Sequence, residues 1–167
     1  MGFMKGFYSG HGLFDIHYPS APGWEAAGTV VLSGGGILAW RVMGLRVAFT
    51  RSIRNDTEMI HGGCFQQYVI ADALNCIPLP DNISFDKGSM FFVNPITAIG
   101  LVEKIQSLQG KAAVQTAACG QLGKMIVKLC QLNNIPLINI VRKDEQVKIL
   151  KEEYGSQYVL NQTDPDF

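Results

Sequence analysis

The chain has 167 residues, of which 47% are hydrophobic, and its 14 basic side chains balance 14 acidic ones. This length is enough for one ordinary domain or two small ones with a real core, and the charge balance offers no field that would attract nucleic acid or an anionic membrane surface. No apolar run approaches the roughly 20 residues that a membrane helix needs, and the glycines and histidines scattered through residues 1–20 are unlike a secretory signal. We therefore expect a soluble intracellular protein, cytoplasmic or mitochondrial.

The segment from residue 22 to residue 80 alternates short β-rich runs with glycine and proline. Such a pattern predicts short strands joined by tight turns. We expect strands at 27–32, 46–50 and 64–71, a turn at 33–36 and an extended proline segment at 77–82. A helix over 95–107 then leads into the second half of the chain.

The second half alternates between strand and helix patterns. Short apolar runs at 112–116, 137–141 and 158–160 predict three buried strands. Apolar residues spaced by three and four predict a helix after Gly120 with one face on the sheet: Leu122, Met125, Ile126, Leu129 and Leu132. Pro136 breaks this helix. A second helix is predicted over 146–154, and Gly155 ends it. The order βαβαβ predicts an α/β protein with one mononucleotide-binding half of a doubly wound sheet.

A turn of small residues joins the first of these strands to its helix. Ala117, Gly120 and Gly123 give the spacing AxxGxxG, in which small residues let the backbone approach a pyrophosphate and let the helix pack close to the strand. Gln121 and Leu122 belong to the same candidate cofactor-binding set, because the N-terminus of a helix offers free N–H groups to an anion. Such a motif also occurs for packing reasons alone, and the βαβαβ context is what favours a dinucleotide.

An arginine directly follows the second strand of this unit. A carboxylate there would bind the ribose 2′-hydroxyl of NAD, whereas a guanidinium suits the extra phosphate of NADP. Arg142 therefore predicts NADPH as the cofactor, with Lys143 as a second candidate contact. The alternative for both is a solvated basic surface, and the neighbouring Asp144 and Glu145 can simply favour the start of the next helix.

The four cysteines and three histidines form no metal-ligand pattern. The cysteines are dispersed, without a CxxC pair or a matching histidine cluster, so reduced thiols are the simpler interpretation. Cys119 differs because it lies in the glycine turn, where oxidation or alkylation would block a cofactor. His11, His17 and His61 have no second ligand at useful spacing and are interpreted as surface or loop residues.

Eight segments occur in a fixed order along nearly the whole chain: PGWEAAGTVV, GLRVAF, GGCFQQYVIAD, CIPLPDNISFDKGSM, VNPITAIGLVE, VQTAACGQLGKM, INIVRKDEQ and YVLNQTDPDF. This set resembles the zinc-independent medium-chain dehydrogenase/reductases, in particular their quinone-oxidoreductase-like and enoyl-reductase-like branch. The resemblance implies a GroES-like β-rich domain, here 1–93, before an NADP-binding Rossmann domain, here 94–167. It further implies hydride transfer from NADPH to a small-molecule substrate, a quinone, an enoyl or an α,β-unsaturated carbonyl compound, in an enzyme that forms homodimers.

Zinc-dependent members of the same superfamily carry histidine in a GHE motif where this chain has Gly23, Trp24 and Glu25. A tryptophan cannot ligate zinc, and the dense four-cysteine lobe of a structural zinc site is also missing from the sequence. We therefore expect no metal. The oxyanion or enolate that develops on the substrate must then receive a hydrogen bond or a proton from the protein.

Tyr8 is the candidate catalytic acid. It lies in GFY, which resembles the GxY segment whose tyrosine is a catalytic acid in mitochondrial enoyl reductases; an aromatic side chain packed at a domain edge is the alternative. Asn94 and Thr97 in VNPITA match a segment that lines the cofactor cleft near the nicotinamide in relatives. Asn94 also directly precedes Pro95, so a helix N-cap is a compatible interpretation.

Members of this family are considerably longer, so we expect the start of the GroES-like domain and the second half of the Rossmann fold to be missing. The strand at 112–116 would then be an open apolar edge, and we expect the chain alone to aggregate, to be partly disordered or to depend on a partner. Two explanations stay open. The chain is a fragment of an NADPH-dependent oxidoreductase, or it is a catalytically incomplete partial copy that acts as a binding or assembly subunit.

Overall fold

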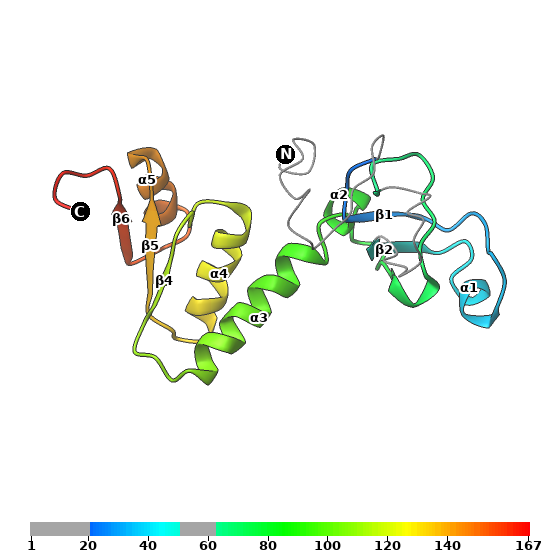
Figure 1. Cartoon of the computed structure of the whole chain (residues 1–167), viewed down its shortest axis with the longest axis horizontal. Helices are drawn as coiled ribbons and strands as arrows, with labels where there is room; N and C mark the ends of the chain where they lie inside the picture. The colour runs from blue at the N-terminus through cyan, green and yellow to red at the C-terminus, as the bar shows by residue number, and fades with distance from the viewer. Residues whose placement is uncertain (1–20, 51–62) are drawn as a thin grey trace, which may run out of the picture. The chain divides into compact units, whose positions relative to one another are not determined.

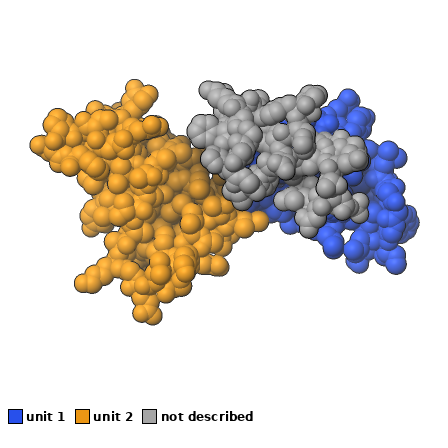
Figure 2. Space-filling model, in the orientation of Figure 1, with its two compact units in different colours: residues 1–93 blue, residues 94–167 orange. Residues whose placement is uncertain are grey.

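The computed structural model describes residues 21–50 and 63–167. The chain divides into two compact units, residues 1–93 and 94–167 (Figure 2). Tyr8, His11, His17 and His61 lie outside the described residues. Within the described ranges, no helix combines the length and the hydropathy needed to cross a membrane.

The first unit contains a three-stranded antiparallel sheet with the order β1-β2-β3 (Figure 1). β1 (Glu25–Thr29) and β2 (Arg46–Thr50) pair along their full lengths, and β3 (Cys76–Pro78) pairs with the other edge of β2. Among the described residues of this unit, the buried apolar ones are Val47, Ala48, Cys64 and Leu79. Two of them lie on β2, so the central strand carries much of the small core.

Three short helical elements lie among the described residues of the first unit. α1 (Ile37–Arg41) lies between β1 and β2, a 3-10 turn (Ala73–Asn75) precedes β3, and α2 (Phe85–Gly88) follows it. α2 begins after Ser84, whose Oγ accepts a hydrogen bond from the Lys87 N–H at 3.3 Å. The sequence predicted none of the three, because elements this short show no helical period.

Two strand predictions in this unit are corrected. β1 ends at Thr29 instead of residue 32, and the side chain of Leu32 is 86% exposed. Residues 64–71 form no strand, and the Phe65 N–H donates instead to Pro22 O at 2.8 Å, outside any ladder. β-branched and aromatic residues give a segment strand propensity, but a strand forms only where a neighbouring strand offers its hydrogen bonds.

The second unit contains a three-stranded parallel sheet with the order β4-β5-β6. The elements from the unit boundary onward are α3 (Val93–Ser107), β4 (Ala113–Gln115), α4 (Gln121–Leu132), β5 (Leu137–Val141), α5 (Asp144–Glu152) and β6 (Tyr158–Asn161). α4 and α5 each return the chain to the start of the next parallel strand, as βαβ units require. The predicted α/β class, an antiparallel GroES-like sheet followed by a parallel Rossmann-type sheet, is confirmed.

The core of the second unit lies between the sheet and its helices. One cluster of buried residues comprises Ala98, Val102, Ala118, Ile126, Val127, Cys130, Leu137, Val141, Leu150 and Val159. The buried residues of α4 are Gly123, Ile126, Val127 and Cys130. Leu132, the last residue of the predicted apolar stripe, is 78% exposed. The other four residues of the predicted face do pack on the core: Ile126 is buried, and Leu122, Met125 and Leu129 lie partly buried against the cluster. Gly123, Val127 and Cys130 add to this face, and a pattern of large apolar residues does not detect the buried glycine.

α5 spans Asp144–Glu152 instead of the predicted 146–154. The Lys143 carbonyl accepts a hydrogen bond from the Gln146 N–H at 3.0 Å, so the helix starts directly after Lys143. Asp144 and Glu145 lie in its first turn, where the helix dipole favours negative side chains. Gly155 has a φ of 63° beyond the last turn, so the predicted glycine stop is confirmed.

One edge and one face of the parallel sheet are left open by the described residues. β4 is an edge strand, and its central residue Val114 is 62% exposed. Val114 is in register with Ile138 and, across β5, with Tyr158, which is 49% exposed. These residues share a face that the buried cluster does not include. The sheet is thus packed on one side, whereas parallel sheets are normally covered on both.

Candidate cofactor site

The turn between β4 and α4 is held by short-range backbone hydrogen bonds. Ala117 has a φ of 52°, a left-handed conformation that costs an alanine roughly 1 to 2 kcal/mol. The Gly120 N–H donates to Ala117 O at 2.9 Å, and the Lys124 N–H donates to Gly120 O at 3.0 Å. The chain therefore turns sharply at Ala117 and enters α4 directly after Gly120.

Gly123 lets the first turn of α4 lie directly against this turn. A Cβ atom on Gly123 would lie 2.4 Å from Ala118 O and 2.7 Å from Ala118 C. Both are backbone atoms that cannot rotate away. A Cβ atom on Gly120 would lie 3.1 Å from Ala117 O, which is also tight. The spacing AxxGxxG thus corresponds to close backbone packing, most strictly at Gly123.

The N-terminus of α4 is accessible to a ligand. Ala117, Gly120 and Gln121 are exposed, Leu122 is half-buried, and no side chain caps the helix at Gly120. The first N–H groups of a helix have no intrahelical acceptor, and the helix dipole places partial positive charge beside them. A phosphate or pyrophosphate would supply the missing acceptor oxygens.

The carboxyl ends of β4 and β5 lie side by side because the two strands are parallel neighbours. The Ala118 N–H of the glycine turn donates to Ile140 O on β5 at 3.4 Å, which connects the two ends directly. Ligands of open α/β sheets bind at this end of the strands. The glycine turn and the residues that follow β5 therefore share one edge of the sheet.

Arg142 and Lys143 follow β5 at this edge, and both are exposed. The Arg142 N–H donates to Gln146 Oε1 at 3.1 Å, which holds its backbone against the first turn of α5. Within residues 21–50 and 63–167, the Arg142 guanidinium forms no ion pair. It is free to reach an anionic ligand.

Asn94 does not cap α3, so the N-cap prediction is wrong. The helix begins at Val93, which places Asn94 and Pro95 inside its first turn. Glu25 provides the cap instead: its Oε2 accepts hydrogen bonds from the Phe92 N–H at 2.7 Å and the Val93 N–H at 3.0 Å. A carboxylate at a helix N-terminus satisfies free N–H groups and interacts favourably with the dipole, so no local cap is needed.

Thr97 is exposed on α3, and Asn94 is half-buried on the same helix. Ala98, the residue after Thr97, belongs to the same buried cluster as Ala118 of the glycine turn. The first half of α3 and the glycine turn therefore contribute to one core. A contact between the cofactor and either Asn94 or Thr97 stays a prediction.

All four cysteines are free, and none lies in a metal-binding cluster of the described residues. Burial raises the pKa of the Cys130 thiol, and burial together with the charge of Asp72 raises the pKa of Cys76. A raised pKa keeps a thiol protonated and unreactive at neutral pH. Cys119 is half-buried in the glycine turn itself, so its modification would directly affect the candidate cofactor site.

Sequence reasoning missed two amide side chains on the buried face of the parallel sheet. Gln115 Nε2 donates to Asn139 Oδ1 at 2.7 Å and to Gly123 O at 3.2 Å. The sequence contains a signal for them, since each lies within an otherwise apolar strand. Buried polar groups are almost always hydrogen-bonded, so two such residues in neighbouring strands suggest a pair.

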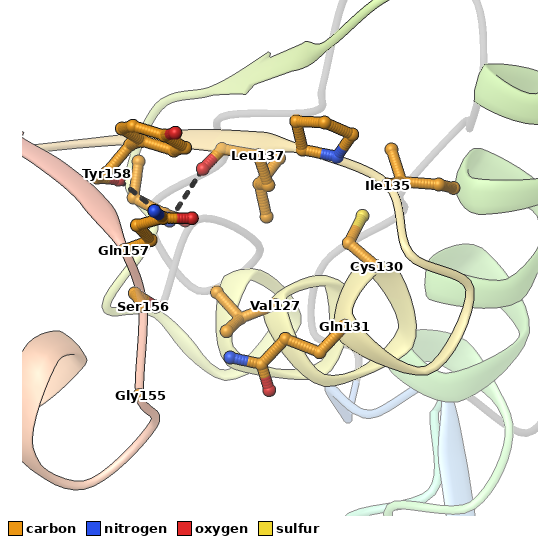
Figure 3. A pocket seen from close by; sticks show the side chains of 11 residues that line it. Val127, Cys130, Gln131, Ile135, Leu137, Gly155, Ser156, Gln157 and Tyr158 are labelled. Carbon is orange, nitrogen blue, oxygen red and sulfur yellow. Dashed lines mark hydrogen bonds between the residues drawn. The ribbon is translucent and has the colours of Figure 1, made fainter.

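A pocket of about 160 Å³ lies at the other end of the sheet (Figure 3). Leu137 and Tyr158, the first residues of β5 and β6, line it together with Cys130 of α4 and Ser156. The Ser156 Oγ is buried and has no hydrogen-bond partner among the described residues. Because nucleotides bind at the carboxyl ends of parallel strands, this pocket does not belong to the candidate cofactor site.

Residues 3–81 match the family model of the alcohol dehydrogenase GroES-like domain. A "Probable quinone oxidoreductase" of Leishmania amazonensis is 29% identical over 157 residues, which are 93% of this chain and 42% of that protein. The trans-enoyl reductase tazE of Aspergillus terreus is 36% identical over 85 residues, which are 49% of this chain and 28% of that enzyme.

Solved structures share the fold of the chain. A "putative NADPH:quinone reductase" from Mesorhizobium loti has a TM-score of 0.78 at 36% identity, over 89% of this chain and 41% of that protein. A Bacillus subtilis protein with NAD bound has a TM-score of 0.66 at 23% identity, over 87% of this chain and 43% of that protein. The chain spans less than half the length of each of these relatives.

Proposed function

Because the chain belongs to the medium-chain dehydrogenase/reductase superfamily, we propose that it carries the cofactor half-site of an NADPH-dependent oxidoreductase. The single observation that carries the proposal is the arrangement at one edge of the parallel sheet. There the N-terminus of α4, which no side chain caps, packs against the glycine turn at Gly123. Arg142 follows the neighbouring strand, and its guanidinium forms no ion pair with the described residues.

A dinucleotide fits the residues of this edge. Its pyrophosphate would accept hydrogen bonds from the first N–H groups of α4, at Gln121, Leu122 and Gly123. The absence of a Cβ atom on Gly120 leaves backbone exposed where the phosphate would approach. Arg142 would take the 2′-phosphate of NADPH, and Lys143 would add a second positive charge.

The fold alone does not choose between NADPH and NAD, since a relative of the same fold holds NAD. The choice is made by the side chain after β5. A guanidinium forms charge-assisted hydrogen bonds with a phosphate, but it offers no acceptor to a ribose hydroxyl. We therefore assign NADPH to this chain, as named for the Mesorhizobium relative.

The proposed reaction reduces a quinone, an enoyl or an α,β-unsaturated carbonyl compound. Bound NADPH supplies the hydride. The protein holds the acceptor in place and stabilises the negative charge that develops on its oxygen. We assign the proton or hydrogen bond for that oxygen to Tyr8, and contacts near the nicotinamide to Asn94 and Thr97. The proposed enzyme is a homodimer that acts without a metal.

Titration of the full polypeptide that contains this sequence with NADPH tests the proposal. We expect micromolar binding, followed by loss of the NADPH absorbance when a quinone or an enoyl thioester is added. Binding without oxidation by either substrate would instead favour the binding or assembly subunit. Failure to bind NADPH would contradict the cofactor assignment.

We also expect the purified protein to hold no stoichiometric zinc, because Trp24 occupies the position of a ligand histidine and tryptophan offers no lone pair to the metal. Chelators should then leave NADPH oxidation unchanged. Elemental analysis of the protein before and after dialysis against a chelator measures this. One zinc per chain would contradict the expectation.

A further inference from the structure

Two amide side chains connect all three strands of the parallel sheet with the first turn of α4. Gln115, the last residue of β4, is in register with Asn139 at the centre of β5. Asn139 is only 1% exposed. Its Nδ2 donates to Leu137 O at 3.4 Å and to Tyr158 O, at the start of β6, at 3.2 Å (dashed lines in Figure 3). Gln115 Nε2 donates to Asn139 Oδ1 and to Gly123 O.

The chemistry of the acceptors determines how both amides are oriented. Gly123 O is a backbone carbonyl and can only accept, so Gln115 must present its NH₂ group there. The same NH₂ group then requires the oxygen of Asn139, which turns Nδ2 of Asn139 toward two further carbonyls. Reversing either amide would place acceptor against acceptor. Both hydrogens of the Gln115 NH₂ group are therefore used, one on the sheet and one on the helix.

The hydrogen bond from Gln115 acts on Gly123, the residue of α4 that lies against the glycine turn. Its missing side chain lets the helix approach the Ala118 backbone, but it also leaves Gly123 with nothing that interlocks with the sheet. A side-chain hydrogen bond to its carbonyl adds a directional restraint to this close backbone packing. The atoms that it restrains belong to the turn whose N–H groups would receive the pyrophosphate.

We propose that Gln115 is a positioning residue for the cofactor: its amide, oriented by Asn139, holds the first turn of α4 in the geometry that binds the dinucleotide phosphates. Gln115 does not touch the cofactor and acts through Gly123. The inference rests on the proposed function, because it concerns the same NADPH site. It predicts that a substitution of Gln115 weakens the binding of every ligand that contains the pyrophosphate. The ratio of the affinities for NADPH and NADH should stay unchanged.

The test substitutes Gln115→Met, which keeps an unbranched chain of similar length and removes the NH₂ group. We expect the Kd for NADPH to rise about tenfold, the factor that one hydrogen bond contributes at the upper end of its usual range. The Kd for NADH should rise by the same factor, so that the ratio of the two stays unchanged. Isothermal titration below the melting temperature measures both constants.

Gln131→Met is the matched control. Gln131 lies near the other end of α4, and its Nε2 also donates to a backbone carbonyl, Tyr154 O at 2.7 Å. This substitution removes the same kind of bond from the same helix, away from the glycine turn. We expect it to leave the Kd for both cofactors unchanged.

The double variant Gln115→Met with Asn139→Leu separates positioning from stability. Removing both polar partners together costs less stability than leaving one buried without its partner. We therefore expect the melting temperature to recover relative to Gln115→Met, while the Kd for NADPH stays raised. A Kd that returns to the unsubstituted value along with the melting temperature would show a purely structural pair and overturn the inference.

Two further outcomes are decisive. If the unsubstituted protein binds NADPH and Gln115→Met binds it equally well, the inference fails while the proposed function stands. If the unsubstituted protein binds no NADPH, the proposed function fails, and the inference that rests on it fails too.

Discussion

Replacement of Arg142 by alanine is expected to erase most of a preference for NADPH over NADH. If the guanidinium takes the 2′-phosphate, the unsubstituted protein should bind NADPH more than about tenfold tighter than NADH, since a charge-assisted bidentate contact contributes roughly 1.5 to 3 kcal/mol. Arg142→Ala removes that contact and leaves the pyrophosphate site intact. Titration of both variants with both cofactors measures the ratio.

The substitution of Arg142 should leave the surrounding structure undisturbed. Arg142 is exposed, and its backbone N–H, which bonds to Gln146, is kept in the alanine variant. Lys148→Ala is the matched control, because Lys148 is an exposed cation on α5 outside the candidate site. It should leave the ratio unchanged. Equal affinities for NADPH and NADH in the unsubstituted protein would refute the assignment of Arg142.

Substitution of Gly123 by alanine should abolish cofactor binding and destabilise the fold. The added Cβ atom would lie 2.4 Å from Ala118 O, so α4 or the turn must move. Overpacking of this kind typically costs about 1 to 3 kcal/mol. A displacement of binding or catalytic groups by about 1 Å can reduce the activity of a site about a hundredfold. We therefore expect the affinity for NADPH to fall by at least that factor. Thermal melting and titration measure the two effects.

Gly100→Ala controls for the general effect of alanine in a helix. Gly100 lies within α3, and a Cβ atom there would meet nothing within 4 Å. Alanine is favoured over glycine in a helix interior by roughly 0.5 to 1 kcal/mol, so this variant should melt at a slightly higher temperature. A Gly123→Ala protein that melts and binds NADPH like the unsubstituted one would show that the close packing is not required.

Local patterns allowed the second unit to be predicted largely from sequence. Apolar runs and turn residues placed β4, α4 and β5 within a residue of their observed bounds, because hydrophobic periodicity reflects which side of an element faces the core. The glycine turn could also be recognised, because its small residues are required by close packing between segments that are adjacent in the sequence. The contacts of the candidate site residues with a cofactor stay predictions.

Predictions failed where the hydrogen-bond partner lies far away in the chain. Asn94 looked like a helix cap from its position before Pro95, but Glu25, 67 residues before Phe92, takes that role. Residues 64–71 are rich in side chains that favour strands, but their backbone bonds join no ladder. A sequence pattern indicates which secondary structure a segment favours. The structure that it adopts also depends on the hydrogen-bond partners that the rest of the fold places beside it.

The sequence by itself determined the α/β class, the order of the elements in the second unit, and the turn of small residues with an arginine after the next strand. These features depend on short-range periodicity and on residues whose chemistry is local. Only the tertiary structure decided that Gly123 lies against Ala118, that Glu25 caps α3, and that Gln115 is bonded to both Asn139 and the first turn of α4. Each of these is a contact between elements, and it depends on strand register and helix placement that no single segment encodes.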